Sequence, residues 1–162
     1  MKALKIFVIA AAMTLVASCG IMSNGTSNTS AQKNASTGTS LGAALLALYT
    51  QYKTDGKIDW SNLNNILNIA TIANTIKNNR NALTENAFVS DVISGSKNLV
   101  TKANAGTVLD QLAALANVNL SQVTNTAKGF NAGAAAPAIN TSSASVVKAT
   151  NVFNDVFAAV AK

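Results

Sequence analysis

The chain has 162 residues, of which 49% are hydrophobic and 5% aromatic, and its formal net charge is +6 with no histidine and one cysteine. Without histidine, and with only six scattered acids, it offers few of the side chains that enzymes use at neutral pH, so we expect no enzymatic activity, no catalytic residue and no cofactor. The basic residues form no dense run and few aromatic residues accompany them, which argues against a nucleic-acid partner.

The first 20 residues combine a positive start, an apolar run and the cysteine. Lys2 and Lys5 precede the apolar stretch 6–16, which is too short to cross a bilayer as a helix but has the length of a signal-peptide core. The sequence Val16-Ala17-Ser18-Cys19, followed by Gly20, resembles the lipobox of bacterial lipoproteins. The alternatives are an ordinary secretory signal with an incidental cysteine, or a short buried helix.

The resemblance implies that residues 1–18 are a lipoprotein signal peptide and that Cys19 is the lipidation site. Diacylglycerol would be attached to the Cys19 thiol, the chain would be cut before Cys19, and the new amine would often be acylated. Two or three acyl chains make a long-lived anchor, since each buried methylene contributes about 0.8 kcal/mol. Loss of Lys2 and Lys5 would lower the formal charge of +6 by two, to +4, so the mature chain would be mildly basic.

The residues after the cysteine bear on where such a lipoprotein would be sorted. Gly20 does not resemble an inner-membrane retention signal, and the following Ile21, Met22 and Ser23 lack the acidic run of a surface-export signal. The resemblance therefore implies the periplasmic face of the outer membrane. Its partners would be the membrane itself, through Cys19, and an envelope protein that the sequence does not identify.

The next segment, 20–40, consists almost entirely of Ser, Thr, Asn, Gly and Ala. Such a segment buries too little apolar surface to offset its ordering entropy, so we expect 19–40 to be a lipidated cysteine followed by a flexible tether. Apolar residues recur at helical spacing through 41–162, which predicts a single all-α domain, a bundle of about five to six helices. The predicted helices are 41–52, 60–78, 85–103, 107–117, 121–129 and 143–161, with a loop of small residues at 130–142 around Pro137.

Three features of these helices can be tested. Ser40 is expected to cap the first helix. The helix 60–78 should be central, because apolar residues cover more than half of its circumference and leave a polar strip that includes Asn68 and Thr75. The helix 85–103 should be continuous, because its apolar face keeps its phase across Gly95, which would then be an exposed glycine.

Asp55, Gly56, Ile58, Asp59 and Asn62 resemble the second half of an EF-hand or dockerin-type calcium loop. The first half of such a loop is missing, since Gln51 and Lys53 stand where ligands would be. Asp55, Asp59 and Asn62 are therefore only a weak candidate for a metal site, and we expect no bound metal. The favoured interpretation is a turn in which Gly56 takes a positive φ and Asp59 caps the next helix.

Tyr49, Tyr52 and Trp60 flank this turn and are weak candidates for ligand binding. They could form an aromatic patch for a glycan or a partner, although the favoured interpretation is that they seal the end of the bundle. The Asn-rich run 78–81 is expected to be a solvated loop. The sequence as a whole predicts a non-enzymatic accessory, scaffold or interaction module. The alternative is a binding protein with a pocket for a small apolar or glycan ligand.

Overall fold

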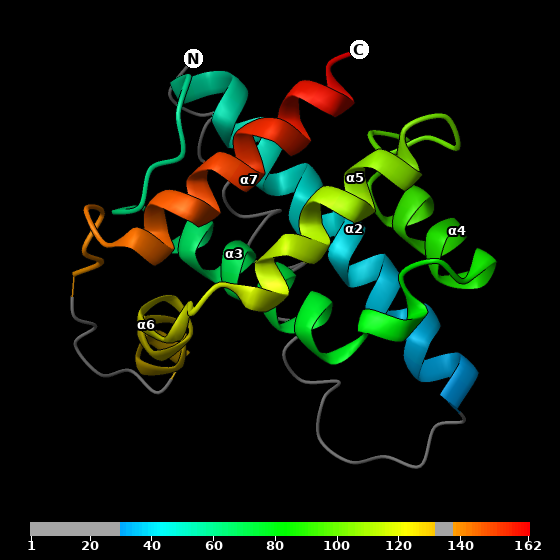
Figure 1. Ribbon diagram of the computed structural model, residues 1–162, viewed down its shortest axis with the longest axis horizontal. Helices are drawn as coiled ribbons and strands as arrows, with labels where there is room; N and C mark the ends of the chain where they lie inside the picture. The colour runs from blue at the N-terminus through cyan, green and yellow to red at the C-terminus, as the bar shows by residue number, and fades with distance from the viewer. Residues whose placement is uncertain (1–29, 132–137) are drawn as a thin grey trace, which may run out of the picture.

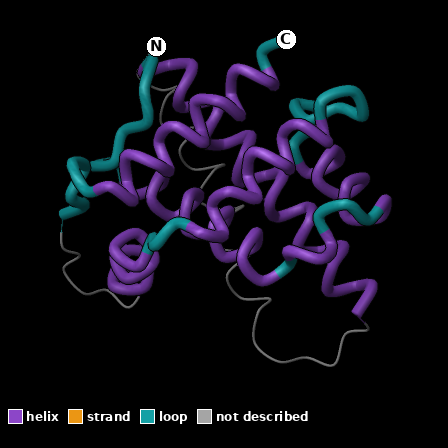
Figure 2. Tube along the Cα trace, in the orientation of Figure 1, coloured by secondary structure: helices purple, strands orange, loops and turns teal. Residues whose placement is uncertain are grey.

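A computed structural model describes residues 30–131 and 138–162, with side chains from Thr37 to Gly129 and from Ala138 onward. This part of the chain is an all-α bundle without strands, as the sequence predicted (Figures 1 and 2). Its elements, in chain order, are α2 (Ser30–Asp55), α3 (Leu63–Asn78), the 3-10 helix η2 (Arg80–Ala82), α4 (Asn86–Gly95), α5 (Ala105–Ala113), the 3-10 helix η3 (Ala114–Asn117), α6 (Ser121–Asn131) and α7 (Ala144–Val160).

The first helix starts earlier and ends later than the expected 41–52. Helix α2 already begins at Ser30, so Ser40 lies inside it and does not cap it. Gly38 and Gly42 are buried against α4, and a Cβ on Gly42 would lie 2.3 Å from the carbonyl oxygen of Val92. Because neither glycine carries a side chain, the backbones of α2 and α4 approach closely here.

The expected continuous helix from 85 to 103 is also wrong, because α4 ends at Gly95. A Cβ on Gly95 would lie 2.2 Å from the carbonyl oxygen of Thr39, so this glycine is part of the α2–α4 contact and is not an exposed position. After it, Lys97 and Asn98 take φ values of 51° and 64° and reverse the chain. The apolar pattern misled because Val100, beyond the turn, is still fully buried.

The side chain of Ser96 holds this turn together. Ser96 is fully buried, its hydroxyl donates to the carbonyl of Ile93 at 3.0 Å, and its Oγ accepts from the backbone N–H of Val100 at 3.0 Å. The backbone N–H of Asn98 also donates to the carbonyl of Ile93, at 3.1 Å. These bonds satisfy backbone groups that a helix end would otherwise leave without partners.

Helix α3 occupies the central position that its broad apolar face predicted, with α2, α6, η3 and α5 packed around it. Its buried apolar residues are Ile66, Ile69, Ala70, Ile72, Ala73 and Ile76. The expected polar strip is partly wrong, because Asn68 is only 3% exposed and Thr75 is also buried. None of the described residues donates a hydrogen bond to the Oδ1 atom of Asn68. Polar residues inside the bundle follow from the central place of this helix, which leaves little of its circumference to solvent.

The second half of the domain is built on α3 and α5. Helix α6 packs against α3, and α7 packs against α5. Helix α7 begins where expected, with the hydroxyl of Ser143 accepting from the backbone N–H of Val146 at 3.4 Å. The predicted fifth helix extends to Asn131, and Pro137 lies outside the described residues. Phe153 and Phe157 of α7 join Phe88 and the aliphatic residues of α2, α3 and α5 in one core.

Candidate functional site

The lipidation site predicted at Cys19 lies outside the described residues, so lipidation stays a prediction. Within the part that the structure describes, no helix is both long enough and apolar enough to span a membrane. The other predicted site residues, in the turn 55–62 and in the aromatic group beside it, can all be placed.

The turn after α2 has the backbone shape that its sequence predicted. Gly56 takes a φ of +71°, and its N–H donates to the carbonyl of Tyr52 at 2.8 Å. Asp55 is exposed, and its carboxylate accepts a hydrogen bond from the side-chain amide of Gln51, one helical turn earlier. Asp55 therefore points back along α2 and ends the helix, with Gly56 supplying the reversal.

Asp59 is tied to the following residues. Its Oδ1 accepts hydrogen bonds from the hydroxyl and the backbone N–H of Ser61. These hydrogen bonds, with a smaller contribution from the charge of Lys57, hold the pKa of Asp59 below its ordinary value. The expectation that Asp59 caps α3 is wrong, because Asp59 instead caps the turn that precedes α3.

Asn62 is the residue that caps α3. Its Oδ1 accepts from the backbone N–H groups of Asn64, at 2.9 Å, and Asn65, at 3.4 Å. Helix α3 consequently starts at Leu63, three residues later than expected. The side-chain oxygens of the predicted half-loop thus serve the turn and the helix cap. Among the described residues, no group of three or more His, Cys, Asp or Glu side chains is arranged to hold a metal ion.

The aromatic residues beside this turn pack α2 and the turn against α7. The rings of Tyr49 and Tyr52 lie 5.4 Å and 4.7 Å, centroid to centroid, from the ring of Phe157. Trp60 is 7% exposed, and its Nε1–H donates to the hydroxyl of Thr150 at 3.1 Å. This geometry favours the interpretation in which the three residues seal one end of the bundle, since both tyrosine rings pack on Phe157 and Trp60 is buried.

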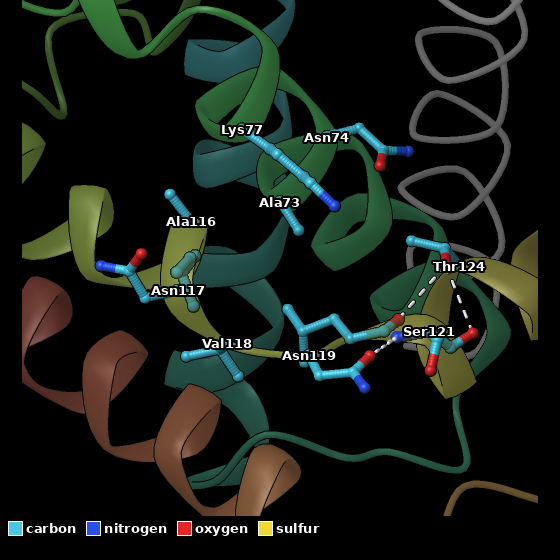
Figure 3. Close-up of a pocket in the computed structure, with 11 residues that line it drawn as sticks. Ala73, Asn74, Lys77, Ala116, Asn117, Val118, Asn119, Ser121 and Thr124 are labelled. Carbon is cyan, nitrogen blue, oxygen red and sulfur yellow. Dashed lines mark hydrogen bonds between the residues drawn. The ribbon is translucent and has the colours of Figure 1, made fainter.

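The structure shows a further candidate that the sequence did not suggest, a hollow of about 350 Å³ between α3, η3 and the start of α6 (Figure 3). We call it the α3–η3–α6 hollow. Three buried apolar residues, Ala73, Leu115 and Leu120, contribute to its lining. Polar residues from α3 and from the segment 117–124 make up much of the remaining wall. The hollow is open to solvent, so it can receive part of a chain as well as a small molecule.

Local hydrogen bonds fix the wall that leads into α6. The Oδ1 atom of Asn119 accepts from the backbone N–H of Ser121 at 3.1 Å. The hydroxyl of Thr124 lies 3.3 Å from the carbonyl oxygens of both Leu120 and Ser121 and donates to them (Figure 3). These bonds hold the segment between η3 and α6 in one shape, so this wall of the hollow is ordered before any partner arrives.

Two cations among the described residues line or border the hollow. Lys77 lines it from the last turn of α3 and extends across the helix surface beside Ala73 (Figure 3). Arg80 reaches it from η2, where its Nη2 donates to Oδ1 of the lining residue Asn117 at 2.7 Å. The expected solvated loop at 78–81 is therefore partly ordered, as η2, and Arg80 links it to η3. No acidic side chain is among the described residues that line the hollow.

Sequence reasoning missed this hollow because its walls come from segments about 40 residues apart. The α3 residues Ala73, Asn74 and Lys77 do not have a spacing typical of a known site, and neither does the run 115–124. The only local signal is the presence of Lys77 and Arg80 near one helix end, which is also explained by the favourable interaction of cations with a helix C-terminus.

We compared the chain with protein-family models, with curated proteins and with solved structures, and found no match in any of the three.

Proposed function

We propose that the protein is a lipid-anchored accessory or interaction module of a bacterial cell envelope, without enzymatic activity of its own. The observation that carries this proposal is the order of features at the start of the chain: two lysines, an apolar run, and Val16-Ala17-Ser18 before the single Cys19. The helical domain adds a reason for the anchor to matter. Helix α2 begins at Ser30, and the intervening chain can span at most about 40 Å, so the domain would stay near the bilayer.

The domain fits an interaction module because it offers a preformed, open surface hollow. The exposed lining residues of the α3–η3–α6 hollow, which form its rim, include Asn74 and the cation Lys77, and the buried ones, which form its floor, are the apolar Ala73, Leu115 and Leu120. Protein interfaces commonly combine a small apolar centre with a polar rim. The alternative, a binder of a small apolar or glycan ligand, calls for a more enclosed pocket that buries most of its ligand. The open shape of the hollow therefore favours a segment of a partner protein.

The anchor is tested by labelling cells with a palmitate analogue. The wild-type protein is expected to carry the label and to fractionate with outer membranes, and Cys19→Ser is expected to lose both properties. Equal labelling of the two proteins would refute the anchor. Ala17→Asp, which places a charge beside the proposed cleavage site and leaves Cys19 in place, should accumulate as uncleaved precursor.

The predicted location is tested on intact cells. If the domain faces the periplasm from the outer membrane, protease added outside the cells leaves it intact, and the same protease removes it once the outer membrane is opened. Digestion in intact cells would instead place the domain on the cell surface. The anchor and the location are thus separate measurements, and either can fail alone.

A further inference from the structure

We propose that the α3–η3–α6 hollow binds an acidic, extended segment of the partner protein. The proposal rests on the proposed function for the class of partner, an envelope protein, and on the structure for the chemistry that is recognised. The occupant is a stretch of chain in which carboxylates alternate with small side chains. Carboxylates would meet the cations of the rim, and the small apolar side chains would enter the floor.

The first argument is charge. Lys77 lines the hollow and forms no ion pair with the described residues, and the guanidinium of Arg80 stands at its edge on Asn117. Lys128 lies one turn beyond the lining residue Thr124 on the same side of α6, and it is exposed. With three cations around a surface that no acid lines, the complementary partner is anionic.

The second argument is the direction of the hydrogen-bonding groups. The Oδ1 atoms of Asn117 and Asn119 already accept hydrogen bonds, from Arg80 and from the Ser121 N–H. Their Nδ2 groups, which can only donate, form no hydrogen bond to described residues. Together with the ammonium of Lys77, they give the rim three groups that can only donate and that no described residue uses. Carboxylates and the carbonyl groups of an extended chain are both acceptors. An acidic extended segment can therefore accept hydrogen bonds from the rim through its side chains and through its backbone.

The third argument is size. A volume of about 350 Å³ is at the lower end of the range for pockets that hold drug-sized molecules, so it accommodates a few side chains of a segment and not a folded domain. The chain's own residues 20–29 contain no acid, so charge gives no reason for them to fill the hollow. Anionic lipid headgroups share the charge of the proposed segment, but they carry no small apolar side chain that would contact the apolar floor.

The test is a calorimetric titration of the full-length protein, extracted from membranes and placed in phosphatidylcholine nanodiscs, whose lipid carries no net charge. The probes are two peptides of about eight residues, one alternating Glu and Ala and the other alternating Gln and Ala. We expect the Glu peptide to bind at least about tenfold more tightly than the Gln peptide. Its binding should weaken as the salt concentration rises, since exposed charges are screened.

The variants separate charge from shape. Lys77→Glu and Lys128→Glu should each weaken the Glu peptide by about three- to fivefold, the usual scale for exposed charge pairs. Lys77→Gln should weaken it less than Lys77→Glu, a gradation that lost packing would not produce. Lys102→Glu makes the same charge change in the exposed loop between α4 and α5, away from the hollow, and should have a smaller effect than either.

Three outcomes would overturn the proposal: no binding of the Glu peptide, equal affinity for both peptides, or equal effects of Lys77→Glu and Lys102→Glu. Vesicles of phosphatidylglycerol provide a separate arm. If they bind with the same dependence on Lys77 while the Glu peptide does not bind, the surface recognises lipid headgroups and the proposal is wrong. If Cys19 proves to be unacylated, the same titration is carried out with the protein in solution, so loss of the anchor would refute the proposed function while the peptide affinities would still decide this inference.

Discussion

Replacing Gly95 with alanine gives the sharpest test of the helix arrangement, because sequence and structure predict opposite signs. At an exposed position inside one continuous helix, the change would stabilise the protein by up to about 1 kcal/mol. In the structure the new Cβ would lie 2.2 Å from the carbonyl oxygen of Thr39 and 2.8 Å from its carbonyl carbon. These are backbone atoms of α2, so the clash cannot be relieved by rotating a side chain, and the two helices would have to separate.

The expected cost follows from that separation. Overpacking a well-packed contact typically costs about 1–3 kcal/mol. The higher helix propensity of alanine relative to glycine offsets less than about 1 kcal/mol of that cost. Gly95→Ala should therefore lower the free energy of unfolding by roughly 1–2 kcal/mol. Gly106→Ala is the matched control, since Gly106 is in α5 and a Cβ there would meet nothing within 4 Å. It should leave stability unchanged or raise it slightly.

Urea melts of residues 20–162, followed by circular dichroism and by the fluorescence of the single tryptophan, measure both variants against the wild type. A form that lacks residues 1–40 would be unsuitable, because it removes Gly38 and with it part of the α2–α4 contact. If Gly95→Ala is as stable as Gly106→Ala or more stable than the wild type, the close contact between α2 and α4 is wrong.

The remaining predictions concern three other parts of the fold. Ile69 is fully buried in α3, so Ile69→Ala should leave a cavity and lower the free energy of unfolding by about 2–5 kcal/mol in the same urea melts. An unchanged free energy of unfolding would contradict the central position of α3. Lys97→Gly should raise the free energy of unfolding by roughly 0.5–1 kcal/mol, because glycine removes the strain of a left-handed backbone at a φ of 51° and this gain exceeds the added entropy of the unfolded chain. A lower free energy of unfolding would show that Lys97 is not strained. Asp59 has a lowered pKa in the folded state, so its ionised form stabilises the fold above the ordinary value of 3.8 and this contribution is lost as the pH falls through the lower folded value. Thermal melts should therefore show Asp59→Asn less stable than the wild type at neutral pH and the difference shrinking below pH 3.8; a difference that does not change with pH would contradict the assigned hydrogen bonds.

The sequence predicted the features of this fold that depend on burial of large side chains. The apolar faces of α3 and α7 identified both helices and the central place of α3, because a wide or regular apolar face has to be covered. The errors arose where small or polar residues do the packing. Gly38, Gly42 and Gly95 carry no side chain to show in a pattern, and their role is visible only when the backbone of the other helix is in place.

The site was harder to predict than the fold. The turn at Gly56 could be predicted because one residue decides its backbone shape. The choice of Asn62 over Asp59 as the cap of α3 could not be predicted, because both are good caps and Ser61, two residues after Asp59, decides between them. The hollow depends on the packing of η3 and α6 against α3, and no local pattern in the sequence brings Lys77 next to Asn117 or Thr124.

The central claim, a membrane-anchored module that binds a partner through the α3–η3–α6 hollow, is tested most directly by photo-crosslinking in living cells. A photoreactive amino acid would replace Asn74, an exposed residue that lines the hollow, or Ser90, an exposed residue on α4 that does not line it. We predict one discrete protein adduct from position 74, none of the same size from position 90, and a weaker adduct when Cys19→Ser is combined with position 74. Identical adducts from both positions, or an adduct from position 74 that does not depend on Cys19, would contradict the account.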